Sequence, residues 1–137
     1  MPAFRSYLDR NGIDVIMAWF DGGARVGATK QARAKFRNKL RNLSRLPRGQ
    51  WRRPLFDTLG EECTGLSEIR FDANNVPWRP LGFFLEIDDG EEVFALVLCA
   101  SKDEHGWIPR NACALGLSRK AEILANRTRV HDLPIAL

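Results

Sequence analysis

The residues best suited to chemistry are three cations that the order of the chain brings toward one another. Arg70 and Arg79 lie on stretches that we expect to be neighbouring strands, and Lys102 follows the next strand. Arginine stays charged at any working pH and offers a planar fork that matches two phosphate oxygens. Such a cluster suits the cleavage of RNA by its own 2′-hydroxyl, which needs in-line geometry and cations but no metal. We therefore assign both arginines to transition-state stabilisation, with Lys102 converging on the same phosphate.

A general base for this reaction would have to titrate near the working pH within hydrogen-bond reach of the hydroxyl. His105 is three residues from Lys102 and is included with the candidate catalytic residues. His131 is a weaker candidate because we expect it in a mobile tail, and Lys102 with a lowered pKa is a third. A plain surface role stays open for both histidines.

Each of the three cations also has a structural explanation. Arg70 could form an ion pair with Glu68, two residues away on the same face of a strand. In that case, loss of Arg70 would impair folding. Arg79 and Lys102 could be ordinary surface charges.

The charge distribution is strongly uneven because there is no acidic residue between Asp21 and Asp57. That window holds 11 of the 21 basic residues, so it nets +11, while the rest of the chain nets −7. Local potential attracts a polyanion, and this asymmetry predicts an acidic partner. The alternative is a solvated helix surface, but such surfaces usually mix both signs for pairing four residues apart. The eleven are Arg25, Lys30, Arg33, Lys35, Arg37, Lys39, Arg41, Arg45, Arg48, Arg52 and Arg53.

The stretch from Pro47 to Pro54 (PRGQWRRP) reads as a loop that places Trp51 beside two arginines. An aromatic ring can stack on a base while arginines hold a phosphate. Equally, Trp51 could pack the loop onto the core. The full set of expected RNA contacts is Lys30, Arg33, Arg37, Arg41, Arg48, Trp51, Arg52 and Arg53.

The first half of the chain predicts one strand and one long helix. The apolar run Ile13 to Phe20 is rich in β-formers and predicts a buried first strand, closed by a turn at Asp21-Gly22-Gly23. From about Ala24 to Leu46, apolar residues recur at steps of three or four, which predicts an amphipathic helix that Pro47 ends. The apolar positions are Ala28, Ala32, Phe36, Leu40 and Leu43.

The second half predicts an antiparallel meander and a C-terminal helix. The Asp-Gly pair in Asp88-Asp89-Gly90-Glu91 is a strong hairpin signal, and Pro80 suggests a bulge or an edge position. The expected strands are Leu66 to Phe71, Trp78 to Ile87 and Glu92 to Ala100, with a turn at Asp72 to Pro77, a polar loop at Ser101 to Trp107 and a helix from Pro109 to Arg127. The fold class is therefore α+β, with helices packed on a small, mainly antiparallel sheet.

The bulk properties indicate a single soluble domain over residues 1–137, with a core of about 13–128 and a tail of 129–137. No apolar run of about 18 residues and no signal-peptide pattern occurs, so we expect neither export nor membrane insertion. Cys63, Cys99 and Cys113 are odd in number and lack metal-ligand spacing, which predicts neither a disulfide framework nor a metal site and fits a reducing cytoplasm. Acids around the Asp-Gly turn more simply keep the hairpin soluble than bind a cation, and we expect no cofactor.

Four short matches, taken in order, resemble the RelE/ParE toxin superfamily and its phage-derived HigB-like branch across roughly Asp14 to Arg127. They are Pro54-Leu55 followed by Glu68-Ile69-Arg70, similar to an "LxELR" strand of the family; Trp78-Arg79, similar to its aromatic-Arg strand; Ser101-Lys102 at the end of the last strand; and Pro109 with Arg119-Lys120 in a C-terminal helix. The order and spacing of the matches carry the resemblance.

The resemblance implies a RelE-like fold, a toxin of a type II toxin–antitoxin system and endonuclease action on messenger RNA at the ribosome. It also implies a cognate antitoxin, of helix-turn-helix type, and the cationic window favours an acidic segment in that partner that folds on binding. Some relatives with the same fold poison DNA gyrase instead, so fold alone does not choose the target. A non-toxic nucleic-acid-binding accessory protein of a phage or mobile element is the remaining alternative.

Overall fold

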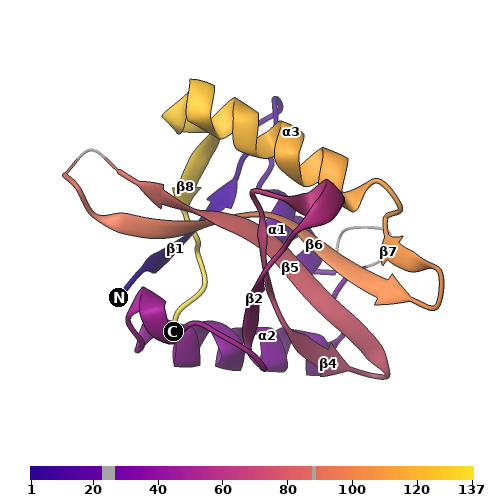
Figure 1. Cartoon of the computed structure of the whole chain (residues 1–137). Helices are drawn as coiled ribbons and strands as arrows, with labels where there is room; N and C mark the ends of the chain where they lie inside the picture. The colour runs from indigo at the N-terminus through magenta and orange to yellow at the C-terminus, as the bar shows by residue number, and fades with distance from the viewer. Residues whose placement is uncertain (23–26, 88) are drawn as a thin grey trace.

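A twisted sheet forms the central layer, with helix α2 on one side and helix α3 on the other (Figure 1). The computed structural model describes residues 1–22, 27–87 and 89–137. In them the helices are α1 (Val15–Phe20), α2 (Lys30–Ser44) and α3 (Ala112–Ala125), with short 3-10 helices η1 (Arg48–Gln50), η2 (Glu61–Cys63) and η3 (Arg127–Arg129). The strands are β1 (Ala3–Tyr7), β2 (Phe56–Thr58), β3 (Ser67–Ile69), β4 (Phe71–Ala73), β5 (Val76–Glu86), β6 (Glu92–Asp103), β7 (Gly106–Ile108) and β8 (Val130–Asp132).

The strand order is β2-β3-β5-β6-β1-β8, with β4 also pairing with β5 and β7 with β6. Only the β1–β6 pair among the described strands is parallel. The expectation of an α+β fold with a mainly antiparallel sheet is therefore confirmed.

The predicted first strand over Ile13 to Phe20 is wrong, because Val15–Phe20 form helix α1. The Asp14 side chain caps that helix, with Oδ1 accepting the backbone N–H groups of Ile16 and Met17 at 3.0 Å each. A short apolar run does not distinguish a strand from a buried helix by periodicity, and here the cap decides. The first strand is β1, which starts ten residues earlier than expected, at Ala3.

The C-terminal residues are part of the sheet, so the expected core of about 13–128 is too narrow. Strand β8 pairs with β1, and His131 is the Cα partner of Ser6. The His131 ring Nε2 lies 2.6 Å from Asp14 Oδ2, which also accepts the Ser6 hydroxyl at 2.6 Å. His131 therefore joins β8 to the cap of α1 and does not lie in a mobile tail.

Helix α2 confirms the apolar stripe but is shorter than the predicted span from Ala24 to Leu46. Thr29 caps it, with Oγ1 accepting the Ala32 N–H at 3.1 Å. The predicted start, the end of the Asp21-Gly22-Gly23 turn and the cation Arg25 lie outside the described residues. The stripe Ala32, Phe36, Leu40 and Leu43 is buried against the sheet, as predicted.

The β5–β6 hairpin is confirmed, although Asp88 at its turn lies outside the described residues. The expected bulge near Pro80 is also present, as a register shift between Leu81 and Gly82. On the other side of β5, the neighbour changes from β4 to β3, so the predicted single strand over Leu66 to Phe71 is interrupted at Arg70. Proline has no N–H for a ladder bond, and Pro80 lies where the partner strand changes.

After this hairpin, the end of β6 and the start of α3 differ from the positions predicted from the sequence. The expected polar loop from Ser101 to Trp107 is a second hairpin, in which β6 runs on to Asp103 and pairs with β7. Pro109 precedes α3 by three residues and is not in its first turn. None of the helices in the described part of the chain is long and apolar enough to cross a membrane.

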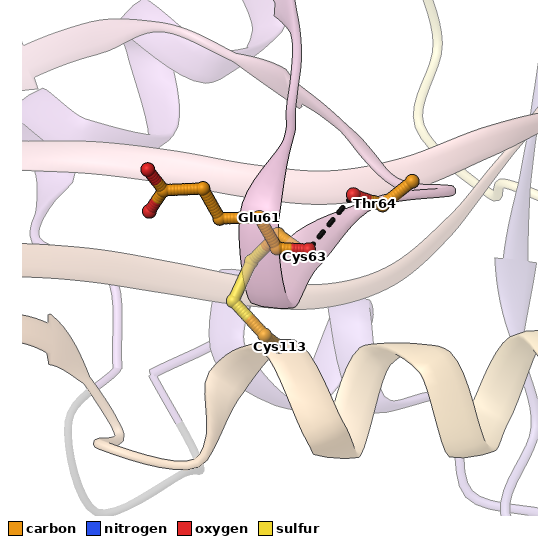
Figure 2. Close-up of a disulfide and its surroundings, with 4 residues drawn as sticks. All are labelled: Glu61, Cys63, Thr64 and Cys113. Carbon is orange, nitrogen blue, oxygen red and sulfur yellow. Dashed lines mark hydrogen bonds between the residues drawn. A yellow bond between two sulfur atoms is a disulfide. The ribbon is translucent and has the colours of Figure 1, made fainter.

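The cysteines contradict the expectation that no disulfide forms. Cys63 and Cys113 are disulfide-bonded with a Cα–Cα distance of 4.8 Å, and Cys99 is a free thiol (Figure 2). The bond joins η2 to the first turn of α3 across a sequence separation of 50 residues. Only the tertiary fold brings these two positions together, and cysteine usage no longer argues for a reducing compartment.

Candidate functional site

A cavity opens between α2 and the point where β3 ends and β4 begins. Its volume is ≈ 490 Å³. Three segments that are far apart in sequence line it: one face of α2, the loop before β2, and the β3–β4–β5 region. The lining residues are Lys35, Asn38, Lys39, Arg53, Pro54, Leu55, Arg70, Phe71, Asp72 and Arg79.

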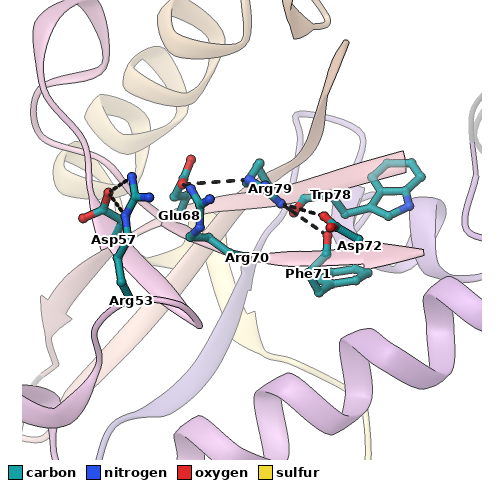
Figure 3. Close-up of polar contacts among 8 residues, drawn as sticks. All are labelled: Arg53, Asp57, Glu68, Arg70, Phe71, Asp72, Trp78 and Arg79. Atoms are coloured by element: carbon teal, nitrogen blue, oxygen red, sulfur yellow. Dashed lines mark hydrogen bonds and ion pairs between the residues drawn. The ribbon is translucent and has the colours of Figure 1, made fainter. Parts of the chain in front are cut away.

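Arg70 is placed at the cavity by the interruption between two short strands. Its backbone N–H donates to the Leu55 carbonyl at 2.9 Å, which fixes the chain to the loop before β2. Its guanidinium forms an ion pair with the Glu68 carboxylate, whose side chain is only 1% exposed (Figure 3). The ion pair that the sequence left open for Arg70 is therefore present, and Arg70 lines the cavity as well.

Arg79 is a buried cation and not an ordinary surface charge, since its side chain is 11% exposed. Its Nη1 donates to the Trp78 carbonyl at 2.7 Å and lies 3.5 Å from Asp72 Oδ1. Burial lowers the pKa of Arg79, the neighbouring Arg70 lowers it further, and the nearby carboxylates oppose both effects. Arg79 therefore has partners in the protein that a phosphate would compete with or join.

The same buried carboxylate serves both arginines. Glu68 Oε2 pairs with Arg70 and lies 3.9 Å from Arg79 Nε. Figure 3 draws the three side chains together. In the described residues, Glu68 Oε1 and Arg79 Nε are buried and have no hydrogen-bond partner. Glu68 thus holds the two arginines side by side, a role that the sequence reasoning did not assign to it.

The α2 side of the cavity carries the less constrained charges. Lys35 Nζ donates to the Asp72 carbonyl at 2.8 Å. Lys39, one helical turn further, has no carboxylate partner among the ion pairs of the described chain. Arg53 at the rim pairs with Asp57 at 2.9 Å, with both side chains partly open to solvent. Exposed pairs of this kind exchange readily for another anion.

Lys102 does not join the two arginines in the cavity lining. The register pairs Arg79 with Ala100, so Lys102 lies two residues further along β6. Its ammonium group sits 4.3 Å from the centre of the Trp107 ring, a cation–π contact within the β6–β7 hairpin. Of the three cations that were expected to converge, only Arg70 and Arg79 line the cavity.

Neither histidine lines the cavity. The His105 side chain is 72% exposed at the tip of the β6–β7 hairpin, beside Glu104. Just after β7, Arg110 pairs with Asp103 of β6, and this hydrogen bond is the main cause that lowers the pKa of Asp103 to about 2. His131 belongs to the Asp14 cluster described above. Neither histidine is therefore placed to act as a general base at this cavity.

Trp51 corrects another expectation, because it packs the loop onto the core and does not present a stacking face. It is 5% exposed, and its Nε1 donates to the carbonyls of Leu43 and Leu46 at 3.0 Å each. Arg48 pairs with Glu92 at 2.6 Å. Arg52 is exposed next to Trp51, and Arg53 reaches the cavity.

The cations of α2 form two rows. Arg33, Arg37 and Arg41 recur every four residues and lie on one face, about 6 Å apart along the axis. Lys35 and Lys39 form the second row, which faces the cavity. Lys30 is exposed at the start of the helix.

The residues that the sequence reasoning missed are those that complete the cavity from other elements. Lys35, Asn38 and Lys39 follow a helical spacing, which was a usable signal once α2 was expected. Asp72 carried no such signal, because its place at the cavity depends on which strands are adjacent, and the sequence indicated the pairing of Glu68 with Arg70 but not its contact with Arg79. Among the described residues no group of three or more His, Cys, Asp or Glu side chains is placed to hold a metal ion.

Comparison with protein-family models, with curated proteins and with solved structures finds no match to this chain. The resemblance to the RelE/ParE superfamily therefore rests on the sequence matches alone. The site rests on its own geometry: five cations from three segments around one cavity, with a single acid among them.

Proposed function

We propose that this protein is the toxin component of a type II toxin–antitoxin system, with a RelE-like fold and a long basic helix near its N-terminus. In this proposal it cleaves messenger RNA at the ribosome, in the cytoplasm, without a metal ion or other cofactor. A cognate antitoxin, of helix-turn-helix type with an acidic segment, neutralises it.

The main support is the cavity that brings Arg70 and Arg79 together with the lysines of α2. Arg70, between β3 and β4, and Arg79, on β5, are held by one buried glutamate and can take two oxygens of a single phosphate. Lys35 and Lys39 extend the positive potential along the cavity wall. A polyanion that enters here finds five cations and one carboxylate, Asp72.

The reaction that these groups support is an intramolecular transesterification of the RNA backbone. The ribose 2′-oxygen attacks the adjacent phosphorus, the bond to the 5′-oxygen breaks, and the products are a 2′,3′-cyclic phosphate and a 5′-hydroxyl end. Arg70 and Arg79 stabilise charge on the non-bridging oxygens. The hydroxyl proton leaves to solvent and the 5′-oxygen takes one from solvent, because neither histidine lines the cavity.

Inducible expression in a bacterial host tests this proposal. Growth and the 5′ ends of cellular messenger RNA are followed for the wild type, Arg70→Ala and Arg79→Ala. Arg110→Ala is the matched control, because Arg110 is another ion-paired arginine but lies outside the cavity. Arg79→Lys accompanies Arg79→Ala, since a buried cation is more safely replaced by another cation.

The expected result is growth arrest with new 5′ ends that disappear in the Arg70 variant and persist in the Arg110 variant. New ends that persist in folded Arg70 and Arg79 variants would place the chemistry elsewhere. No arrest with all variants folded would overturn the toxin proposal.

A second candidate is a non-catalytic inhibitor of a macromolecular target such as DNA gyrase. One observation favours it: both arginines already have carboxylate partners, and neither histidine is available at the cavity as a base. Growth arrest with intact messages would select this candidate over the nuclease.

A further inference from the structure

Strand β5 has an open edge over residues 83–86, which we call the β5 edge. On one side these residues pair with β6, as far as Glu86 opposite Glu92. On the other side, β3 begins at Ser67 opposite Gly82 and pairs no further along β5. Within residues 1–22, 27–87 and 89–137, no strand pairs with this side of residues 83–86, and no backbone hydrogen bond outside the strands reaches them. Such an edge presents backbone N–H and C=O groups with which another strand can pair.

A separate cavity of ≈ 310 Å³ adjoins the β5 edge. Phe83 and Phe84 line it from β5, and Ser67 lines it from the start of β3. Among the described residues its lining includes two cations, Arg48 and Lys120, and no acidic side chain. The lining therefore gives the β5 edge a positive potential, which favours an acidic occupant.

The two cations lie on opposite faces of the sheet, one over each phenylalanine ring. The Arg48 guanidinium carbon is 3.9 Å from the centre of the Phe84 ring, which packs with α2. The Lys120 ammonium nitrogen is 5.1 Å from the centre of the Phe83 ring, which packs with α3. Neighbouring side chains of a strand alternate between the two faces. Two consecutive acidic residues of an added strand would therefore point one toward Arg48 and the other toward Lys120.

Both cations have donors to offer such a strand. Arg48 pairs with Glu92 at 2.6 Å, but the two side chains are 55% and 38% exposed. An exposed pair of this kind exchanges readily for another carboxylate. Lys120 Nζ donates to the Gly65 carbonyl at 2.8 Å and forms no ion pair in the part of the chain that the structure describes. An ammonium group has three donors, so two remain on Lys120.

The charges at the β5 edge favour a peptide over the other possible occupants. A second copy of this chain, paired edge to edge, would bring cations of the two copies together on each face, and like charges repel. A nucleic acid offers phosphates to Arg48 and Lys120 but has no strand to pair with β5. An extended acidic peptide satisfies the backbone groups and both cations.

We propose that the β5 edge docks an extended acidic segment of a partner protein, which adds one strand to the sheet and places two consecutive carboxylates on Arg48 and Lys120. Backbone hydrogen bonds supply affinity in this mode of recognition, and the side-chain contacts supply specificity. This docking site is separate from the cavity that Arg70 and Arg79 line, because the two linings share no residue. The proposal does not depend on the nuclease reaction.

Fluorescence anisotropy of labelled peptides with the purified full chain tests the proposal. The probe is the peptide Gly-Thr-Val-Glu-Glu-Val-Thr-Gly. One control peptide carries lysine in place of both glutamates, and another keeps the glutamates but is N-methylated at both, which removes backbone donors without changing the charge.

Two double variants of the protein separate local charge from net charge. Arg48→Glu with Lys120→Glu reverses the charge at the β5 edge. Arg10→Glu with Arg110→Glu is the matched control, because it makes the same change in net charge at two exposed arginines outside this cavity. Circular dichroism establishes that each variant is folded.

The expected result is saturable binding of the glutamate peptide to the wild type, with the lysine and N-methylated peptides at least about tenfold weaker. The variant with reversed charge at the β5 edge should prefer the lysine peptide, while the matched control keeps the preference of the wild type. That exchange of preference also shows that the variant has kept its edge.

Absence of binding to the wild type, or equal binding of the N-methylated peptide, overturns this inference. Displacement of the bound peptide by oligouridine would assign the β5 edge to nucleic acid, and a wild-type dimer that the reversed-charge variant dissociates would assign it to a second copy. Either finding also overturns the inference. The cleavage experiment is a separate measurement, so failure of one proposal is distinguished from failure of the other.

Discussion

Glu68 and Arg70 form an ion pair across an interval of two residues, and the carboxylate of that pair is 1% exposed. The same oxygen of Glu68 lies 3.9 Å from Arg79 Nε. One buried acid therefore balances two cations from different parts of the sheet, Arg70 between β3 and β4 and Arg79 on β5. This relationship couples the stability of the sheet to the arrangement of the cavity, because β3 carries the acid and β5 carries the second arginine.

Glu68→Gln is expected to lower the free energy of unfolding by about 3–5 kcal/mol, because it removes the buried carboxylate that pairs with Arg70 and leaves Arg79 with only the exposed Asp72 as a counter-charge. Urea unfolding measures the change. Asp57→Asn is the control: its pair with Arg53 is largely exposed, and its loss should cost less than about 1 kcal/mol. Equal effects of the two substitutions would show that burial does not make the Glu68 pair special.

The α2 row formed by Arg33, Arg37 and Arg41 is expected to contribute to RNA binding through its charge alone. Replacement of Arg33, Arg37 and Arg41 by glutamine should reduce the slope of log affinity against log salt by about 2, since each phosphate contact on a single strand contributes about 0.7. Binding of single-stranded RNA is measured over a range of salt concentrations by fluorescence anisotropy.

The control for that row removes the same number of charges outside α2, by glutamine substitution of the exposed residues Arg10, Arg110 and Arg127. This variant should bind RNA with an almost unchanged salt slope. A similar loss of slope in both triple variants would mean that net charge, and not the α2 surface, attracts the RNA.

The parts of the fold that were predictable from sequence are those with strong local signals. The apolar stripe of α2 and the Asp-Gly hairpin between β5 and β6 follow from helical periodicity and turn chemistry. The strand predicted over Ile13 to Phe20 was wrong because this run is too short for its periodicity to distinguish a strand from a helix. The Asp14 cap favours the helix. β1 was missed because its few residues precede that run.

The sequence predicted which candidate residues lie close together only where the neighbouring segments of the meander bring them together. Arg70 and Arg79 were expected to be close because a meander pairs neighbouring strands, and they are. Lys102 was expected to join them, but the β6–β7 hairpin holds its ammonium group over Trp107. Trp51 was equally compatible with two roles, since a sequence does not show which carbonyls its Nε1 can reach.

The Cys63–Cys113 disulfide should stabilise the protein by about 2–4 kcal/mol, because it closes a long loop of the unfolded chain. The double substitution to serine should lower the urea midpoint, and a reductant should lower that of the wild type to the same value. Thiol titration of the denatured protein should find only Cys99 free. Three free thiols, or a midpoint that a reductant leaves unchanged, would contradict the bond.

Tyr7 gives a titration that can be read without ambiguity, because it is the single tyrosine of the chain. Burial raises its pKa above 10.0, and its hydrogen bond to Glu122 and the charge of that carboxylate raise it further, against the opposing effects of Arg119 and Arg129. The fold therefore favours the neutral phenol. Its contribution to stability is complete below pH 10 and is lost as the pH rises through the folded-state pKa.

Ultraviolet absorbance of the phenolate should give a midpoint above 10.0 in the folded wild type. Glu122→Gln should bring that midpoint down without returning it fully to the ordinary value, since burial, the largest cause, remains. Glu62→Gln, at an exposed glutamate in η2, is the matched control and should leave it unchanged. A wild-type midpoint at or below the ordinary value would mean that the phenol is open to solvent and that Tyr7 is not buried against α3.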